Sequence, residues 1–224
     1  MSTYKALRKN ASAPQVDAAL IAALRELPVA AISDNMHRNT GTGILQPYYK
    51  PVATTMAGTA VTARSRGGDN LTYLRALEFC RPGDVLIIDA GGDLQNAVAG
   101  GILTYYAARI GVAGVVIDGA VRDVAELRER EFPVYARGVT HRGPYKDGPG
   151  EINVPVSVGG MVVNPGDVVV GDQDGLLAIP PEDVPLLIDK ARAVLATEAE
   201  TIRAMKEDRW DRSFIDALEA RCNN

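Results

Sequence analysis

The sequence contains few of the residues that support thiol or imidazole chemistry. Among its 224 residues there are two cysteines, Cys80 and Cys222, and two histidines, His37 and His141. The cysteines are far apart and have no metal-ligand spacing, which favours a reduced intracellular compartment. With two histidines, a zinc site built from several histidines is excluded unless carboxylates supply the remaining ligands.

Long apolar runs and an excess of positive charge are also missing. No stretch approaches the roughly 20 apolar residues that a membrane-spanning helix needs, and the first residues lack the apolar segment of a secretory signal. The formal net charge is −4, so we expect no basic surface for nucleic acid or an anionic membrane. The sequence therefore predicts a cytoplasmic protein with no nucleic-acid or membrane partner.

Motifs for nucleotide chemistry are not found either. The glycine pairs at 67–68 and 91–92 lack the spacing of a dinucleotide-binding or phosphate-binding loop, and no serine nucleophile elbow occurs. These absences disfavour a nucleotide-dependent reaction and a methyltransferase with a glycine-rich cofactor loop.

The composition is that of an ordinary globular protein, with 46% hydrophobic and 23% charged residues. No linker divides the chain. We expect one domain over residues 1–224, with a core at about 33–180 and a closing helix at 181–208.

Apolar periodicity predicts alternating helices and strands in the first half, a β-rich middle and a final helix. The apolar runs at 85–88 and 112–117 are typical of strands buried on both faces, and Gly159–Gly160 predicts a hairpin. Further strands are predicted at 58–64, 134–136, 152–158, 161–163, 168–170 and 176–179. Helices are predicted at 16–27, 71–79, 96–109, 124–130 and 181–208, with Ser33 or Asp34 capping a short helix. A polar loop at 138–150 and a loose tail after 208 complete a layered α/β fold, sheet packed on sheet with helices outside.

The strongest candidate site is Arg122–Asp123, which follows a predicted buried strand. Ligands of open α/β sheets gather at the carboxyl ends of strands. Arg122 offers a planar guanidinium that can hold a carboxylate by two hydrogen bonds, and Asp123 is an oxygen ligand suited to Mg²⁺ or Mn²⁺. The alternative is a surface pair at a helix start, where the aspartate favours the helix dipole.

Two weaker candidates accompany this pair. If Gly100 and Gly101 open a helix, its free N–H groups would face an anion; alternatively, the two glycines allow the helix to pack closely. His141 could act in acid–base chemistry, or it could be a solvated loop residue.

Several separated blocks together make the chain resemble a known family. This family contains 4-hydroxy-4-methyl-2-oxoglutarate aldolase (also 4-carboxy-4-hydroxy-2-oxoadipate aldolase) and the regulator of ribonuclease activity A. The resemblance runs from about Ser33 to the closing helix. The blocks that carry it are Gly68–Asn70, Arg81–Val85, Asp89–Asp93, Gly101 followed after twenty residues by Arg122–Asp123, Glu151–Val156, Gly166–Asp172 and Asp174–Gly175.

The resemblance implies a three-layer ββα fold of the swivelling-domain type, with flanking N- and C-terminal helices. It also implies homotrimers or homohexamers with sites at subunit boundaries. Asp123 would carry the divalent cation, Mg²⁺ or Mn²⁺, and Arg122 would bind the pyruvyl part of the substrate. The stretch Gly100, Gly101, Ile102 and Leu103 would donate backbone N–H groups to it.

Two acidic residues complete the implied site. Glu126 completes the family's Arg-Asp-x-x-acidic pattern. A glutamate from the C-terminal helix of a neighbouring subunit would approach the site; Glu198 is the best match, and Glu200 is the alternative.

The implied activity is a metal-dependent lyase that acts on small 2-oxo acids through a pyruvate enolate. The reaction would be oxaloacetate decarboxylation, retro-aldol cleavage of 4-hydroxy-4-methyl-2-oxoglutarate-type substrates, or both. The characterised aldolases carry an acidic residue at the position of Gly101, whereas the decarboxylating pattern has glycine, so decarboxylation is favoured. The alternative is a non-catalytic regulator that binds ribonuclease E; those regulators lack the metal ligand that Asp123 provides here.

Overall fold

A parallel sheet of four strands forms the centre of the computed structural model, which describes residues 7–38 and 40–222. The strands run in the order β3 (Met56–Ser65), β4 (Asp84–Asp89), β6 (Gly114–Val121) and β7 (Val134–Val139). Residues 85–88 of β4 are fully buried. This confirms the strand predicted from their apolar character, and burying each such side chain contributes about 1.5–3 kcal/mol.

Shorter strands pair with these four and give the sheet mixed character. The strands β8 and β11 pair antiparallel with β3, β12 pairs antiparallel with β11, β2 pairs antiparallel with β7, β1 runs parallel to β8, and β5 runs parallel to β6. Their bounds are β1 Leu7–Lys9, β2 Gln46–Pro47, β5 Ala97–Ala99, β8 Gly150–Ile152, β11 Val168–Gly171 and β12 Leu176–Ile179. The predicted mixed α/β class is confirmed.

Three helices cover one face of the sheet. They are α3 (Leu71–Ala76), which continues as a single 3-10 turn over Leu77–Phe79, α4 (Gly101–Arg109) and α5 (Val124–Arg128). One apolar cluster joins their inner sides to the sheet, with Tyr73, Ala107 and Leu127 at most 1% exposed. This cluster fixes the positions at which α4 and α5 begin, and these positions form part of the site.

A hairpin covers the other face and supplies a second β layer. The strands β9 (Val156–Val158) and β10 (Met161–Val163) pair antiparallel through Gly159 and Gly160, both of which have positive φ. The hairpin predicted from these glycines is confirmed, because positive φ costs glycine little. A second apolar cluster, which includes Ile87, Val116 and Val158, fills the space between the layers.

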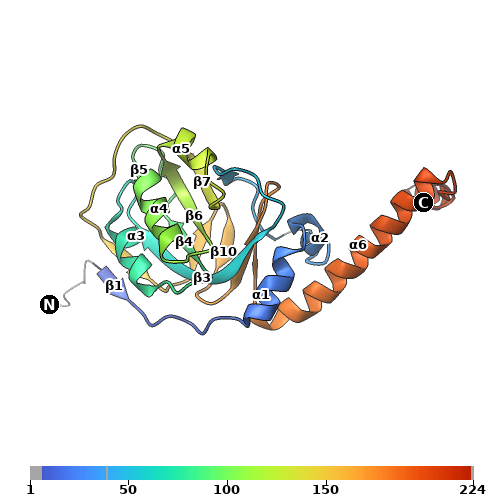
Figure 1. Ribbon diagram of the computed structural model, residues 1–224, viewed down its shortest axis with the longest axis horizontal. Helices are drawn as coiled ribbons and strands as arrows, with labels where there is room; N and C mark the ends of the chain where they lie inside the picture. The colour runs from blue at the N-terminus through green and yellow to red at the C-terminus, as the bar shows by residue number, and fades with distance from the viewer. Residues whose placement is uncertain (1–6, 39, 223–224) are drawn as a thin grey trace.

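The third cluster joins two helices from the N-terminal part of the chain to the start of the long C-terminal helix. Helices α1 (Ala18–Arg25), α2 (Val29–Ser33) and α6 (Val184–Lys206) pack with β11 and β12. The buried residues of α6 all lie in its first turns, from Val184 to Ala191. Val194 and Leu195 still pack against the cluster. Beyond them the helix projects away from the body and leads to α7 (Phe214–Cys222) at its far end (Figure 1). We call residues 196–222 the arm.

Three sequence-based expectations were wrong. The helix predicted at 96–109 begins at Gly101, because 97–99 instead forms the strand β5, which pairs with the C-terminal end of β6. Ser33 and Asp34 end a short helix instead of capping its start; that helix follows Pro28, whose fixed φ suits helix entry. The tail after 208 was expected to be loose, but it contains the helix α7.

Smaller differences concern boundaries. The single strand predicted at 152–158 is two strands, β8 and β9, which are separated at Asn153–Pro155, where Asn153 has positive φ. The loop predicted at 138–150 gives its first two residues to β7 and its last to β8. Within the described ranges, no helix combines the length and the apolar character that crossing a bilayer requires.

Candidate functional site

A cavity of about 250 Å³ opens where β5 and β6 end and α4 begins. The β3–α3 turn and the loop between β7 and β8 (the β7–β8 loop) complete its wall. Of the residues that the sequence singled out, the cavity is lined by Gly100, Ile102, Leu103, Arg122 and Asp123. These residues come from two chain segments about twenty positions apart, which β5 and β6 bring together as neighbouring strands.

Asp123 turns the chain sharply between β6 and α5. Its backbone is left-handed, with φ 59° and ψ 35°, a conformation that aspartate tolerates better than most residues. The turn brings its carboxylate back to α4, where Oδ2 accepts a hydrogen bond of 2.9 Å from the N–H of Gly101. The side chain is 41% exposed, so the carboxylate is oriented by the protein and still open to a ligand.

Arg122 lies beside this carboxylate on the same cavity. Its Nε is 3.7 Å from Asp123 Oδ2, and its backbone N–H donates to the carbonyl of Ala99 over 3.1 Å. The two candidate side chains therefore face one another and one cavity. Their charges are opposite and both are partly exposed, so they could grip different atoms of one small anion, the guanidinium directly and the carboxylate through a cation.

Gly100 and Gly101 allow other groups to approach the start of α4 closely. A Cβ at Gly100 would collide with the Asp123 carboxylate and the Arg122 side chain, and one at Gly101 would collide with the Glu126 carboxylate. The N–H groups of the first helical turn have no acceptor within the helix, so they favour an anion. The predicted helix start at this glycine pair is confirmed, because α4 begins at Gly101 and Gly100 precedes its first turn.

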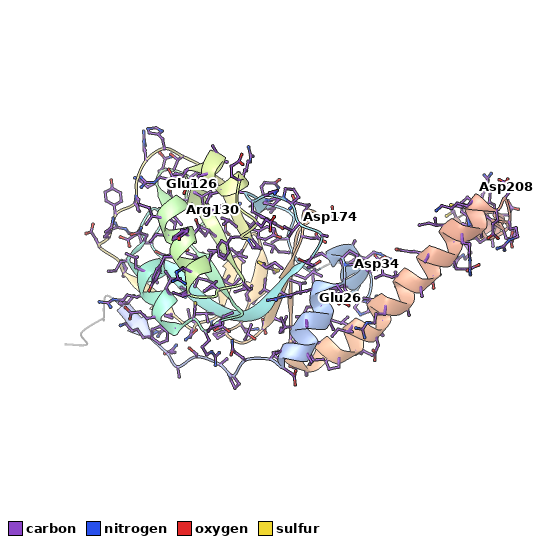
Figure 2. All side chains as sticks on the ribbon, viewed as in Figure 1. Glu26, Asp34, Glu126, Arg130, Asp174 and Asp208 are labelled. Carbon is purple, nitrogen blue, oxygen red and sulfur yellow. The ribbon has the colours of Figure 1, made fainter. Side chains whose placement is uncertain are left out.

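Glu126 does not line the cavity but lies directly behind Gly101. Its carboxylate forms an ion pair with Arg130, and Arg130 Nη1 donates to the carbonyl of Gly101 over 2.9 Å. The Arg130 guanidinium also lies 5.2 Å from the ring centre of Tyr105. Figure 2 shows Glu126 and Arg130 close together, at the end of the molecule opposite Asp208 on the arm. The pair ties α5 to the first turn of α4.

Sequence reasoning gave no site role to six residues that line the cavity: Asn70, Leu74, Val98, Ala99, Pro144 and Lys146. Asn70 is 4% exposed, and its Oδ1 is buried without a hydrogen-bond partner among the described residues. A buried acceptor without a donor is costly, so Asn70 is suited to meet a donor from a ligand. Its presence in the Gly68–Asn70 block was the available signal; Lys146 gave none, because it belongs to an otherwise ordinary polar loop.

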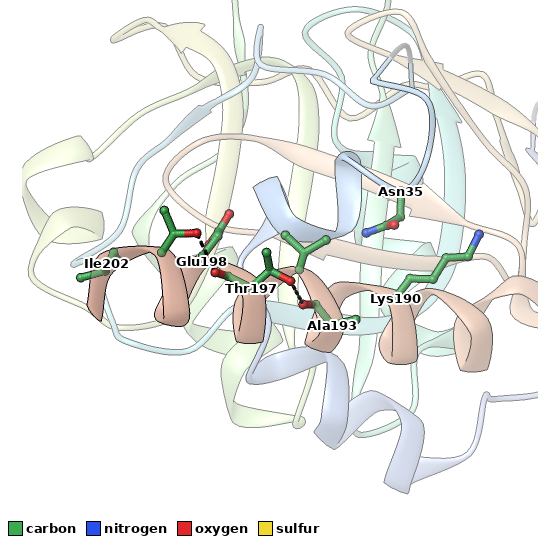
Figure 3. Close-up of a pocket in the computed structure, with 8 residues that line it drawn as sticks. Asn35, Lys190, Ala193, Thr197, Glu198 and Ile202 are labelled. Carbon is green, nitrogen blue, oxygen red and sulfur yellow. Dashed lines mark hydrogen bonds between the residues drawn. The ribbon is translucent and has the colours of Figure 1, made fainter. Parts of the chain in front are cut away.

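Glu198 lies in a different place. It lines a groove of about 610 Å³ along α6, together with Asn35, Lys190 and Ile202 (Figure 3). The groove lies on the arm side of the molecule, away from α4 and α5 (Figure 1), so a single chain does not bring Glu198 to Arg122 and Asp123. Glu200, the alternative, forms an ion pair with Arg203 on the same helix.

The two histidines do not line the cavity. His141 is exposed in the β7–β8 loop, and His37 lines a separate groove near the start of α6. The cavity lining therefore contains no histidine among the described residues.

The donor set around Asp123 fits a hard divalent cation of low protein coordination. Among residues 7–38 and 40–222, no three His, Cys, Asp or Glu side chains converge as a metal cluster. Mg²⁺, however, commonly takes one or two carboxylates and completes its octahedron with water and substrate oxygens. Asp123 Oδ1 makes no hydrogen bond within the described part of the chain, so it could serve as that single ligand.

The layers and the cavity define an α/β protein with a small polar cavity at the ends of its strands. The chain belongs to the RraA-like family: the family model described as Aldolase/RraA matches residues 29–178. A similar relative is a putative 4-hydroxy-4-methyl-2-oxoglutarate aldolase from Halalkalibacterium halodurans. It is 36% identical over 195 residues, which cover 87% of this chain and 92% of that protein.

Other relatives carry two different kinds of name. A Thermus thermophilus protein named 4-hydroxy-4-methyl-2-oxoglutarate aldolase is 44% identical over 112 residues, which cover 50% of this chain and 68% of that protein. A solved structure titled as the RNA-processing inhibitor RraA, also from Thermus, has a TM-score of 0.63 at 36% identity and covers 69% of this chain and 93% of its own. The Streptomyces coelicolor protein RraAS2, titled an unusual member of the RNase ES inhibitor RraA protein family, has a TM-score of 0.75 at 28% identity, with 84% and 97% coverage.

Proposed function

We propose that this chain is a divalent-metal-dependent lyase that releases pyruvate from small 2-oxo acids through a pyruvate enolate. The observation that carries the proposal is the shared cavity of Arg122 and Asp123 at the N-terminus of α4. Relatives named 4-hydroxy-4-methyl-2-oxoglutarate aldolase support the same class of reaction.

Substrate binding would use the positive side of the cavity. The Arg122 guanidinium and the first-turn N–H groups of Ile102 and Leu103 would hold the C1 carboxylate and the 2-oxo oxygen. Mg²⁺ or Mn²⁺ held by Asp123 would supply Lewis-acid polarisation of the 2-oxo group. The hydrogen bond from Gly101 to Asp123 Oδ2 would keep that carboxylate in position during turnover.

The bond that breaks is C3–C4 of the substrate. In oxaloacetate its electron pair would move to C2–C3 as the C4 carboxylate leaves as CO₂, and C3 of the enolate would then take a proton from water. In a 4-hydroxy substrate the same bond would break as the 4-hydroxyl loses its proton and becomes a carbonyl. Arg122 would stabilise the negative charge that develops on the enolate oxygen, and this charge is larger in the transition state than in the substrate.

Residues of the β3–α3 turn and the β7–β8 loop would hold the far end of the substrate. Lys146 would pair with a second carboxylate, and the unpartnered Oδ1 of Asn70 would accept a hydrogen bond from a 4-hydroxyl group or from water. Two cationic side chains, Arg122 and Lys146, line the cavity and favour a dianion, so we propose 2-oxo dicarboxylates as the substrate class. A volume of about 250 Å³ suits a small acid.

Between the two reactions, we propose that decarboxylation is the more efficient. Gly101 carries no side chain, and the space beside it is occupied by the Glu126 carboxylate, which is already paired with Arg130. A retro-aldol step needs a base for the 4-hydroxyl proton, whereas loss of CO₂ needs none.

We further propose that Glu198 acts from a neighbouring subunit in a homotrimer or homohexamer. Its helix carries exposed apolar residues beyond the body, including Ile202 and Met205 at 53% and 43% exposure. An exposed apolar surface of this kind favours contact with another chain, and a glutamate carried on it could reach a site that its own chain cannot supply.

The direct test is pyruvate release from a panel of 2-oxo acids, coupled to lactate dehydrogenase, with and without a chelator. We expect Mg²⁺- or Mn²⁺-dependent turnover of oxaloacetate well above the rate with the metal alone, abolished by the chelator and restored by excess metal. Turnover no faster than metal alone on every 2-oxo diacid would reject the proposal.

The names of the structural relatives favour a second candidate, a regulator that binds ribonuclease E. In that case the cavity would not matter for binding. A pull-down with purified ribonuclease E tests this candidate. Binding by both the wild type and Asp123→Asn, together with no turnover of any 2-oxo acid by the wild type, would favour the regulator.

A further inference from the structure

Asp69 is a buried carboxylate in the turn between β3 and α3. It is 0% exposed and accepts four N–H groups. Oδ1 accepts from the backbone of Leu71 over 2.9 Å. Oδ2 accepts from the backbones of Asp147 and Gly148 over 2.7 and 3.0 Å, and from Arg66 Nη2 over 3.4 Å. Two of these four donors belong to the β7–β8 loop, far from Asp69 in sequence.

Backbone contacts join the same two segments beside Asp69. Tyr145 donates to the carbonyl of Gly68 over 2.9 Å, and Asn70 donates to the carbonyl of Tyr145 over 3.0 Å. Lys146 lies between Tyr145 and Asp147, and the N–H of Asp147 donates to Asp69. Backbone hydrogen bonds therefore hold the chain on both sides of Lys146. Asn70, the next residue after Asp69, lines the cavity with Lys146.

We propose that Asp69 is a positioning residue that holds Lys146, and with it the far end of the cavity, in place for a second substrate carboxylate. This inference rests on the proposed function, because it assigns Lys146 to the substrate. Asp69 is not itself among the residues that line the cavity. Asp69 acts through the β7–β8 loop, and it affects how substrate is bound, not how the C3–C4 bond is cleaved.

The charge of Asp69 is what makes it suited to this role. A fully buried carboxylate needs several hydrogen-bond donors, and hydrogen bonds to a charged acceptor are about twice as strong as neutral ones. In Asp69→Asn, an NH₂ group that cannot accept replaces one oxygen, so either the N–H of Leu71 or those of Asp147 and Gly148 lose their acceptor. In both orientations the side chain is neutral, and any hydrogen bond that remains to the loop is weaker. Residue 69 would then hold the β7–β8 loop more weakly, while the volume of the side chain changes little.

The first experiment compares substrates with and without the far carboxylate. For Asp69→Asn we expect the KM for oxaloacetate to rise by roughly tenfold, with kcat within about twofold of wild type. The inhibition constant of pyruvate, which has no second carboxylate, should change by less than about twofold. Asp147→Asn is the matched control, because it removes an exposed carboxylate from the same loop and leaves its backbone N–H in place. An equal increase in the KM for oxaloacetate and in the inhibition constant of pyruvate would overturn the proposal.

A double-mutant cycle tests whether Asp69 acts through Lys146. Lys146→Met should raise the KM for oxaloacetate by itself, and adding Asp69→Asn should then have little further effect on KM. Full additivity of the two KM effects would show that Asp69 acts elsewhere, and the assignment would fail.

A measurement without substrate separates this inference from the proposed function. Hydrogen exchange at the amides of Asp147 and Gly148 should be faster in Asp69→Asn than in wild type, and unchanged in Asp147→Asn. Unchanged exchange in Asp69→Asn overturns the positioning role even in an active enzyme. A wild-type protein inactive on every 2-oxo acid overturns the proposed function, whatever the exchange shows.

A second variant covers the case in which Asp69→Asn does not fold. Arg66→Met changes a side chain that is 45% exposed, and it removes contacts to Asp69, to Asp147 and to the ring of Tyr145. We expect the same direction of change at smaller size, in both KM and amide exchange. A KM for oxaloacetate equal to that of wild type, with unchanged exchange, would count against the proposal.

Discussion

The N–H of Gly101 donates a hydrogen bond of 2.9 Å to the carboxylate of Asp123. This contact joins the first residue of α4 to the residue that precedes α5, so the two helix starts are held together at the edge of the cavity. It also occupies one carboxylate oxygen and fixes the direction of the other. The proposed chemistry depends on this orientation as much as on the identity of the two residues.

Removing the charge of Asp123 should remove activity and leave the fold intact. Asp123→Asn keeps an oxygen that can accept from Gly101 and suits the left-handed backbone, but it weakens a cation site. We expect the pyruvate release rate to fall by about 10²–10³-fold at any Mg²⁺ concentration tested, with an unchanged thermal midpoint. Asp174→Asn, at a distant exposed loop, is the charge-matched control. Full activity in Asp123→Asn would contradict the proposed role.

Replacing Arg122 by lysine tests whether geometry or charge is required. Lysine keeps the positive charge but cannot make two parallel hydrogen bonds from one plane. We expect kcat/KM for oxaloacetate to fall by roughly 10²-fold in Arg122→Lys, and further in Arg122→Ala. Steady-state kinetics at saturating Mg²⁺ measure this. Near-normal kcat/KM in the lysine variant would mean that charge alone suffices.

A side chain at Gly100 should disturb the site more than the fold. A Cβ there would push against Asp123 and Arg122, whose side chains are partly exposed and can move. We expect Gly100→Ala to lower kcat/KM by about tenfold or more, with a shift of the thermal midpoint no larger than that of the control. Gly43→Ala is the control, since an added Cβ there makes only an ordinary contact. Equal activity in the two variants would argue against close packing at Gly100.

Mixing two inactive variants tests whether Glu198 acts between subunits. Chains with Asp123→Asn and chains with Glu198→Gln should each be inactive alone. If each site combines Asp123 of one chain with Glu198 of another, random mixed oligomers restore about a quarter of the wild-type sites. Activity measured after unfolding and refolding the chains together, compared with each variant refolded alone, detects this. No recovery despite proven mixing would place Glu198 outside the shared site.

The two cysteines should differ sharply in reactivity. Burial raises the pKa of the Cys80 thiol to about 12, with a further increase from nearby Asp84 and a partial decrease from Arg81. The thiolate is the reactive form, so Cys80 stays neutral and unreactive up to strongly alkaline pH. At pH 8 we expect a thiol reagent to label the exposed Cys222 quickly and Cys80 only after denaturation. Rapid labelling of both in the native protein would be inconsistent with the packing described here.

The sequence predicted the central strands because a strand buried on both faces is an uninterrupted run of apolar residues. The run at 85–88 contains only large apolar residues and so indicates a covered strand without help from the rest of the chain. The hairpin at Gly159–Gly160 was equally clear, since two adjacent glycines between apolar runs have few other uses. In both cases the signal is local.

Elements that depend on distant partners were harder to predict. Residues 97–99, Ala-Val-Ala, suit a helix as well as a strand. They form a strand because the pairing of β6 with β4 ends at Asp118, which leaves Ala120 and Val121 of β6 to pair with β5. Lys146 belongs to a polar loop whose position depends on Asp69, about 80 residues earlier in the chain. The Arg122–Asp123 pair could be proposed because its two residues are adjacent, whereas Asn70 and Lys146 meet only in the folded chain.

The left-handed backbone at Asp123 restricts which residues can follow Arg122. Apart from glycine, aspartate and asparagine are the side chains that adopt this conformation most readily. The replacement that best preserves the turn, asparagine, is also one that removes the negative charge. A single substitution at this position could therefore separate the scaffold from its proposed chemistry and leave the outer surfaces available for partners.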